Sequence, residues 1–113
     1  MHEVSIIKRV IEIAEYEARR AGAERVSVIR VRVGEFRGVV ASSLEFAYDQ
    51  LRVGTLVEGA RLEIETTPLI LRCEKCGEYR CPLPGLSFFC PQCGMEVVVA
   101  GGRDLEVEYV EVV

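Results

Sequence analysis

The hydrophobic residues at the start of the chain recur three or four positions apart, which is the spacing of one face of a helix. They are Val4, Ile7, Ile11, Ala14 and Ala18, widened by Ile6, Val10 and Ile13. Charged residues such as Lys8, Glu12 and Arg19 fall on the other side, and Gly22 follows as a residue that favours a helix end. The pattern predicts an amphipathic helix over residues 4–21.

Three later stretches alternate between hydrophobic and polar residues, as strands with one buried face do. They cover residues 26–33, 60–66 and 105–109, and Pro68 interrupts the second before residues 69–71. The residues that we expect to face inward are Ile29, Val31, Val33, Leu62, Ile64, Leu105, Val107 and Tyr109. The outward residues are arginines in the first strand and glutamates in the other two, and opposite charges on adjacent strands contribute roughly 0.2–1 kcal/mol per pair. We therefore predict a three-stranded sheet with the first strand in the centre.

A second, shorter helix is predicted between the first two strands. Ser42 and Glu45 have the spacing of a capping box, so we expect this helix to begin at Ser43 and to stop before Gly54. Its apolar face is expected to consist of Leu44, Ala47, Tyr48 and Leu51. Together the elements predict an α+β fold in which two helices pack on the apolar face of the three-stranded sheet.

The segment over residues 72–102 differs from the rest of the chain, because it contains all five cysteines and three of the four prolines. We predict that it is a zinc-ribbon domain inserted into an α+β domain formed by residues 1–71 and 103–113. Two C-x-x-C-G motifs in it supply Cys73, Cys76, Cys90 and Cys93. Each motif can form a tight turn that points two thiolates at one ion, so the pair predicts a tetrahedral Zn(II) site. Two disulfides, or four unrelated buried cysteines, are the alternatives.

A closed shell of four thiolates leaves no open position for water, so the zinc is expected to be structural rather than hydrolytic. The segment has too few apolar residues for a core of its own, and metal binding would therefore drive its folding. The fifth cysteine, Cys81, precedes Pro82 between the two motifs. Its role stays open between four interpretations: a small, partly buried residue in a turn, a free thiol, a spare ligand and a redox-active partner.

Composition and charge exclude several classes of protein. Half of the residues are hydrophobic, and the charges mix both signs to a net −4, which favours a globular domain and argues against a general nucleic-acid binder. No apolar run approaches the ~20 residues that span a bilayer, and the chain begins directly with a helix pattern, so we expect no leader and a cytoplasmic location. Because the acid–base constellations of enzymes are missing, we do not expect an enzyme.

The only histidine, His2, stands directly behind Met1. A lone histidine at a terminus is often just a frayed, solvated tip. Here, however, the amine of Met1 and the amide and imidazole nitrogens of His2 can bind one ion through two fused chelate rings, with Glu3 as a fourth donor. A nitrogen-rich square plane favours Ni(II) or Cu(II). We therefore expect a metal site at the N-terminus.

Several stretches of the sequence resemble the HypA family, the nickel metallochaperones of [NiFe]-hydrogenase maturation. They are MHEVS, VGEFRGVVASSLEFAYDQLRVGTLVEGARLEIETTP, CEKCG, CPQCG and GGRDLEVEYVEV. The match runs in order over nearly the whole chain. The resemblance implies that His2 is the essential nickel ligand, that Glu3 is tied to nickel binding or selectivity, and that the four paired cysteines hold Zn(II). It also implies a partner GTPase that handles nickel, the hydrogenase large-subunit precursor as recipient and, in some members, service to urease.

Two departures from the family pattern stand out. The histidines that many members carry near the zinc motifs are missing, so a second imidazole cannot join the nickel site within one chain, and Cys81 matches no family motif. A zinc-ribbon interaction or nucleic-acid-binding module is the alternative function. Tyr79, Phe88 and Phe89 could stack on bases, although packing of the ribbon is the expected role. A sheet edge is expected to be open, and an open edge allows two copies to exchange strands or domains. A homodimer is therefore a further expectation.

Overall fold

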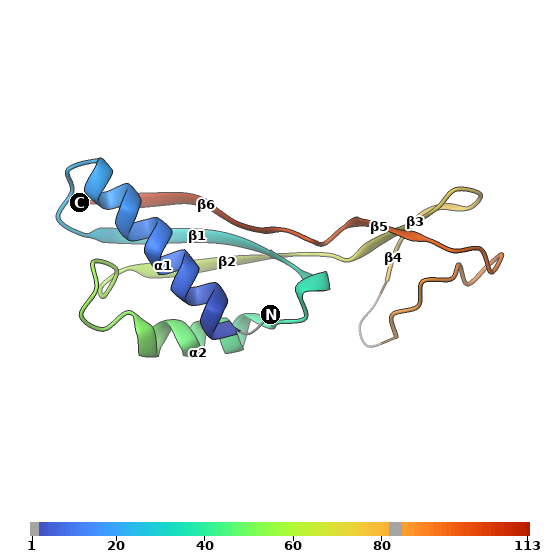
Figure 1. Ribbon diagram of the computed structural model, residues 1–113, viewed down its shortest axis with the longest axis horizontal. Helices are drawn as coiled ribbons and strands as arrows, with labels where there is room; N and C mark the ends of the chain where they lie inside the picture. The colour runs from blue at the N-terminus through green and yellow to red at the C-terminus, as the bar shows by residue number, and fades with distance from the viewer. Residues whose placement is uncertain (1–2, 82–84) are drawn as a thin grey trace.

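The computed structural model describes residues 3–81 and 85–113, and it begins with helix α1 (Glu3–Arg20) (Figure 1). The buried residues of α1 are Ile6, Ile7, Val10, Ile11, Ala14 and Ala18. Val4, which we expected on this face, is 43% exposed, because it lies in the first turn at the edge of the core. Gly22 adopts a φ of +70° directly after the helix, so the predicted glycine end is confirmed.

Helix α2 (Ala41–Leu51) buries Leu44, Ala47 and Tyr48, as its pattern predicts. The predicted start at Ser43 is wrong, because the backbone N–H groups of Ser43 and Leu44 both donate to the carbonyl of Val40. The first turn is therefore closed by the main chain, and no side chain caps it. Ser42 lies inside the helix instead of at its cap. No helix among the described residues has the length and apolarity to cross a membrane.

The first sheet has the predicted arrangement, with β1 (Val26–Gly34) between β2 (Arg61–Thr67) and β6 (Leu105–Val112). Strand β1 runs parallel to β2 and antiparallel to β6. Its inward residues Ile29, Val31 and Val33 are almost completely buried, and they join residues of both helices in one core. The helices therefore cover the apolar side of the sheet, and the other side is left to polar residues.

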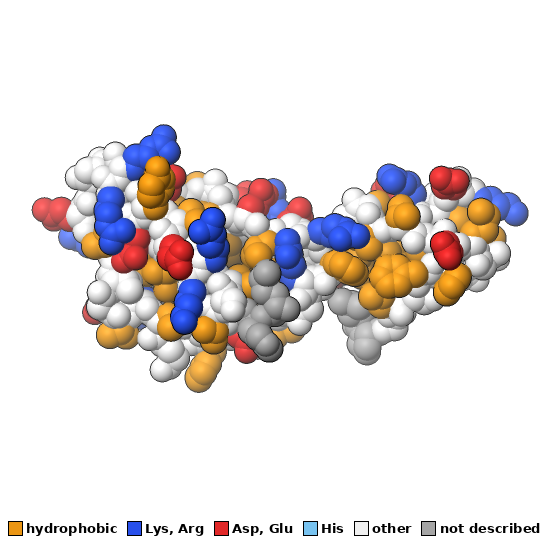
Figure 2. All heavy atoms as spheres, in the orientation of Figure 1, with side chains coloured by type: hydrophobic (Ala, Val, Ile, Leu, Met, Phe, Trp, Pro, Cys, Tyr) orange, Lys and Arg blue, Asp and Glu red, His pale blue; other side chains and the backbone are white. Residues whose placement is uncertain are grey.

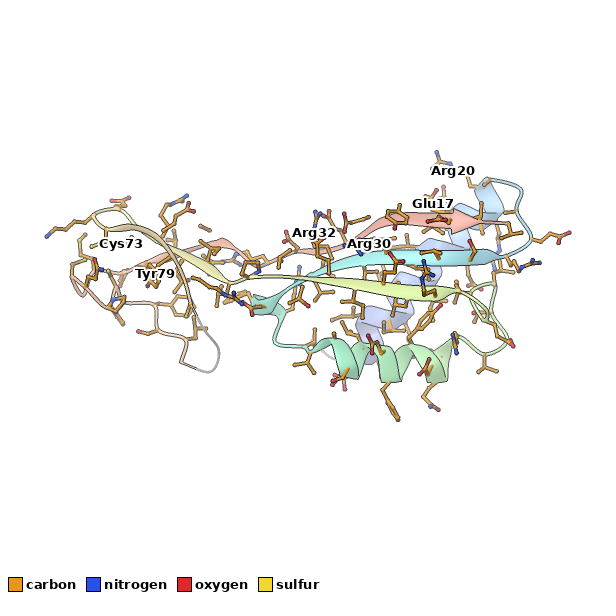
Figure 3. The ribbon with its side chains drawn as sticks, turned by 180° about the vertical axis from the view of Figure 1, so that it is seen from behind. Glu17, Arg20, Arg30, Arg32, Cys73 and Tyr79 are labelled. Atoms are coloured by element: carbon orange, nitrogen blue, oxygen red, sulfur yellow. The ribbon has the colours of Figure 1, made fainter. Side chains whose placement is uncertain are left out.

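The polar side of this sheet carries a network of ion pairs centred on Arg30 and Arg32 (Figure 3). Arg32 reaches Glu106 at 2.8 Å and Glu108 at 2.9 Å, both on β6. Arg30 approaches glutamates of both neighbouring strands at 3.5 Å. The arginine and glutamate alternation thus predicts the order of the strands correctly.

Tyr109 does not face inward as predicted. The register between β1 and β6 shifts between Arg30 and Val31, so that Tyr109 pairs with Arg30 on the polar side. Such a bulge adds one residue to a strand and reverses the facing of those that follow. Val110 packs against the core instead, and Tyr109 is 43% exposed.

A second, antiparallel sheet has the order β4 (Gly77–Arg80), β3 (Ile70–Cys73) and β5 (Val98–Gly101). It has its own small core, which consists of Leu69, Leu71, Cys73, Cys81, Cys90 and Val97. The boundary expected between residues 71 and 72 falls within β3, and the division of the chain into two domains there stays a prediction.

The two sheets lie end to end, so the molecule measures 56 × 24 × 16 Å. Its radius of gyration is 17.2 Å. A compact chain of this length would have about 13 Å. The two parts are connected at a neck, which we define as residues 67–69 and 102–104, braced by the 3-10 turn η1 (Glu35–Arg37). The backbone N–H of Phe36 donates to the carbonyl of Gly102 at 2.9 Å, and the Phe36 ring packs against the second core.

Candidate metal centre

The second sheet brings the four cysteines of the C-x-x-C-G motifs together. The Sγ atoms of Cys73, Cys76, Cys90 and Cys93 all lie within 4.8 Å of one another. Cys73 comes from the end of β3 and Cys76 from the turn that leads to β4, while the other two lie on the connection between β4 and β5. The Sγ atoms of Cys73 and Cys93 lie 3.6 Å from each other, although the two residues are separated by 20 positions in the sequence.

The glycine after each motif allows the chain to turn back. Gly77 has a φ of +92° and Gly94 a φ of +77°, a conformation that other residues adopt at a cost. In the second turn the backbone N–H of Gly94 donates to the carbonyl of Cys90, and that of Cys90 donates to the carbonyl of Met95. Both turns therefore fix two thiols on one side of the loop.

The spacing of the sulfurs fits one tetrahedral ion. Bonds of about 2.3 Å from zinc to four sulfurs place neighbouring sulfurs about 3.8 Å apart. The observed 3.6 Å separation of Cys73 and Cys93 is close to that value. Hydrogen bonds from the backbone N–H groups of Cys93 and Gln92 lower the pKa of Cys90 to about 7, whereas a hydrogen bond with Cys93 raises that of Cys76 to about 12. The two pKa values move in opposite directions because the thiols lie so close together.

Cys81 lies outside the group of four sulfurs, although it is buried in the same core. Its backbone N–H donates to the carbonyl of Leu69 at 2.9 Å. The structure thus places the fifth cysteine at the base of the ribbon, next to the neck, as a buried residue that helps to join β4 to the start of β3.

Tyr79 lies on the inner side of the second sheet, where it pairs with Leu71 across β3 and β4. Its hydroxyl oxygen is buried, and none of the described residues forms a hydrogen bond with it. A buried hydroxyl without a partner costs about 1–3 kcal/mol. Burial raises the pKa of Tyr79, and the charges of Cys90, Cys81 and Cys73 raise it further.

The other aromatic residues of the ribbon behave differently. Phe88 is 44% exposed and Phe89 57% exposed, so the expectation that all three aromatics pack the ribbon is correct only for Tyr79. Figure 2 shows hydrophobic side chains on the surface of this part of the molecule. The exposed ones are Leu86, Phe88, Phe89, Met95 and Val98.

The candidate nickel site is described only at Glu3, because Met1 and His2 lie outside the described residues. Glu3 is half-buried at the start of α1 and borders a groove of about 390 Å³ between α1 and α2. The α2 side of the groove offers the hydroxyls of Ser42 and Ser43 and the amide of Gln50. The carboxylate of Glu3 is the one charged group in this lining.

The fold and the four-sulfur cluster define a small α+β metal-binding protein with a separate four-cysteine centre. Residues 1–112 match the family model described as "Hydrogenase/urease nickel incorporation, metallochaperone, hypA". The chain belongs to this HypA family, which is a family of metallochaperones and not of enzymes.

Relatives and solved structures agree with this assignment. The chain is 43% identical to the hydrogenase maturation factor HypA of Roseiflexus sp. (strain RS-1), over 98% of this chain and 91% of that protein. It is 36% identical to the factor of the same name from Solidesulfovibrio magneticus, over 98% of both chains. The solution structure of the Ni metallochaperone HypA from Helicobacter pylori has the same fold, with a TM-score of 0.68, 23% identity, and 99% of this chain and 97% of that chain covered.

Proposed function

We propose that this protein binds Ni(II) at its N-terminus through Met1, His2 and Glu3 and delivers it to the [NiFe]-hydrogenase large-subunit precursor. The observation that carries the proposal is the match of residues 1–112 to a nickel-incorporation family. The matched range includes the terminal Met-His-Glu. Nickel is the cargo in this proposal, and the protein performs no catalysis of its own.

The terminus suits a transferable nickel ion. The amine of Met1 with the amide and imidazole of His2 closes two chelate rings. The N–H groups in the first turn of a helix have no acceptor within the helix, and Glu3 begins α1, so its amide is available beside its carboxylate. The positive end of the helix dipole opposes a cation there, and a carboxylate or deprotonated amides would offset that charge. Such donors favour square-planar Ni(II).

The second metal is Zn(II), bound by Cys73, Cys76, Cys90 and Cys93. Four thiolates saturate a tetrahedral ion, so this centre serves the fold and not hydrolysis. The spacing of the sulfurs and the small size of the second core support this role, because among the described residues this core has six buried members.

The partners we propose are a GTPase that handles nickel during hydrogenase maturation and the large-subunit precursor, in the cytoplasm. The names of the family and of the relatives support hydrogenase maturation, and the family description also includes urease. A homodimer remains a prediction, based on the open edges of β2 and β6.

Metal analysis of untagged protein tests the proposal. We expect about one nickel and one zinc per chain after dialysis, and His2→Ala should lose the nickel and keep the zinc. The melting temperature should hardly change in this variant. Equal nickel binding by the two proteins would contradict the terminal site, and heparin binding without nickel binding would favour the nucleic-acid alternative.

A further inference from the structure

The groove between α1 and α2 has an apolar lining that the fold leaves uncovered. Its volume is about 390 Å³, and Val4 of α1 lines it together with Phe46, Ala47 and Leu51 of α2. Figure 1 shows the start of α1 beside α2. Phe46 is 69% exposed, although aromatic side chains are among those that gain most from burial. The groove is therefore a place where a partner could bury apolar surface.

Further exposed hydrophobic residues lie at both ends of α2. Val40 directly precedes this helix and Val53 follows it, and both side chains are exposed. With Val4 and Phe46, four large hydrophobic side chains are thus exposed at or beside one helix. Single exposed hydrophobic residues are ordinary, whereas several gathered on one surface indicate a site of interaction.

The charges around Phe46 are acidic. Glu45 and Asp49 are four positions apart in α2 and therefore neighbours on its surface, and Glu3 is the charged residue in the lining of the groove. Asp49 lies 3.5 Å from the guanidinium of Arg52, but α2 itself has no basic residue. Such a surface repels anionic lipid headgroups and the phosphates of nucleic acids, which bind to basic residues. Its charge is complementary to a basic partner.

The groove fits a helix better than a strand. A strand binds by adding to an open sheet edge, whereas the backbone groups of α1 and α2 are bonded within their own helices. A partner must therefore be held by side chains, as an amphipathic helix is when its apolar face lies in a groove. A second copy that presents the same face is disfavoured, because a twofold contact would bring Glu45 and Asp49 of one copy against those of the other.

We propose that the groove between α1 and α2 is a docking site for a basic amphipathic helix of a partner protein. The apolar face of that helix covers Val4 and Phe46. Lysines or arginines beside this face meet Glu3, Glu45 and Asp49. The contact requires no nickel, and so it goes beyond the function proposed above. Because Glu3 lines the groove, a docked helix would lie next to the N-terminus.

The test uses a synthetic helical peptide with leucines on one face and lysines beside them, titrated into the full chain without nickel. Phe46→Ser should weaken the binding of this peptide at least about tenfold, because it removes the aromatic anchor. Phe89→Ser is the matched control, since it removes an equally exposed phenylalanine from the ribbon and should leave the affinity unchanged. The same affinity for all three proteins, or equal losses in the two variants, would overturn the proposal.

The position of the bound peptide can be measured directly. In the NMR spectrum of the unmodified chain, the peptide should shift the backbone amide signals of Ser42, Ser43 and Gln50, which line the groove. Shifts confined to the ribbon would overturn the proposal. A dimer of the unmodified chain that Phe46→Ser separates would also overturn it, in favour of a second copy as the occupant.

An exchange of charge tests the chemistry of the partner. The same peptide with glutamates in place of the lysines should bind the unmodified chain at least about tenfold more weakly. Glu45→Lys should reduce this preference for lysine. Glu24→Lys is the matched control, because it changes the net charge equally but lies beyond the other end of α1. Equal binding of the two peptides by the unmodified chain would overturn the proposal, and since no nickel is present, this result is independent of the terminal nickel site.

Discussion

The carboxylate of Glu35 accepts a hydrogen bond from the backbone N–H of Leu69 at 2.7 Å. Its second oxygen lies 3.3 Å from the guanidinium of Arg80. Glu35 belongs to η1, beside the first sheet, whereas Leu69 lies where the neck meets the second core and Arg80 ends β4. One side chain therefore ties the two parts together across the neck.

Glu35→Ala should lower the free energy of unfolding by about 1.5–3 kcal/mol, because it leaves a partly buried N–H without its charged acceptor. Chemical denaturation measures this change. Arg80→Ala is the control, since its side chain is 66% exposed and surface ion pairs contribute at most about 1 kcal/mol. Equal losses in the two variants would mean that the ion pair, and not the bond to Leu69, is what matters.

Gly34→Ala should destabilise the protein by about 1–3 kcal/mol, because a Cβ at this position would overlap the backbone of Gly102 and Arg103 at the neck. Thermal unfolding checks the effect. Gly59→Ala is the matched control, as a Cβ there meets nothing within 4 Å and the backbone does not have a positive φ. The control should stay within about 0.5 kcal/mol of the unmodified chain.

Cys73→Ala should release the zinc and unfold the ribbon, while the first sheet and its helices keep their circular dichroism. Cys81→Ser should retain one zinc per chain, since Cys81 lies outside the four-sulfur group. Metal analysis after dialysis distinguishes the two. Loss of zinc from the Cys81 variant would show that the wrong four cysteines have been assigned.

An uncleaved Gly-Ser extension before Met1 should weaken nickel binding by at least tenfold, about 1.4 kcal/mol. The extension turns the terminal amine into a peptide nitrogen and removes one chelate ring, while His2 and Glu3 remain. Nickel titration measures the change, with zinc content as the internal control. Equal affinity with and without the extension would require a site made of side chains alone.

Tyr109→Phe should raise the pKa of Glu63, which hydrogen bonds from Arg61 and then Tyr109 hold below the usual value. A lowered carboxyl pKa stabilises the fold above the ordinary pKa of about 4.3, and the gain is lost as the pH falls through the lowered value. The stability difference between variant and unmodified chain should therefore shrink in acid. An NMR titration of Glu63 gives its pKa directly, and an unchanged pKa would contradict the bond from Tyr109.

The alternation of hydrophobic and polar residues predicts the strands of the first sheet and their order. It does not predict features that depend on contacts between residues far apart in the sequence. The alternation of Arg30 and Arg32 with buried neighbours predicts both the facing of β1 and its central place. The bulge that turns Tyr109 outward leaves no mark in the alternation of residues 105–109, because it depends on the pairing with β1. The start of α2 differs from the predicted one for a related reason. The carbonyl of Val40, and not the side chain of Ser42, accepts the hydrogen bonds of the first turn.

At the metal centre, spacing alone predicts which four cysteines converge, because the two cysteines of each C-x-x-C-G motif are close enough in sequence to point at one ion. The unpartnered hydroxyl of Tyr79 could not be predicted in this way. It depends on how deeply the ring enters the ribbon, and this depends on the pairing of β4 with β3. The contact of Glu35 with Leu69 joins residues 34 positions apart and has no signal in the local sequence either.

Two chain segments cross the neck, and this limits how the two ends of the molecule can move. Rotation of the ribbon about the long axis would wind the segments around each other, whereas bending leaves them side by side. We therefore expect the neck to bend more easily than it twists. Bending would change how far the four-cysteine end stands from the start of α1, which lies near the middle of the molecule (Figure 1), without changing which sides of the two parts face the same way.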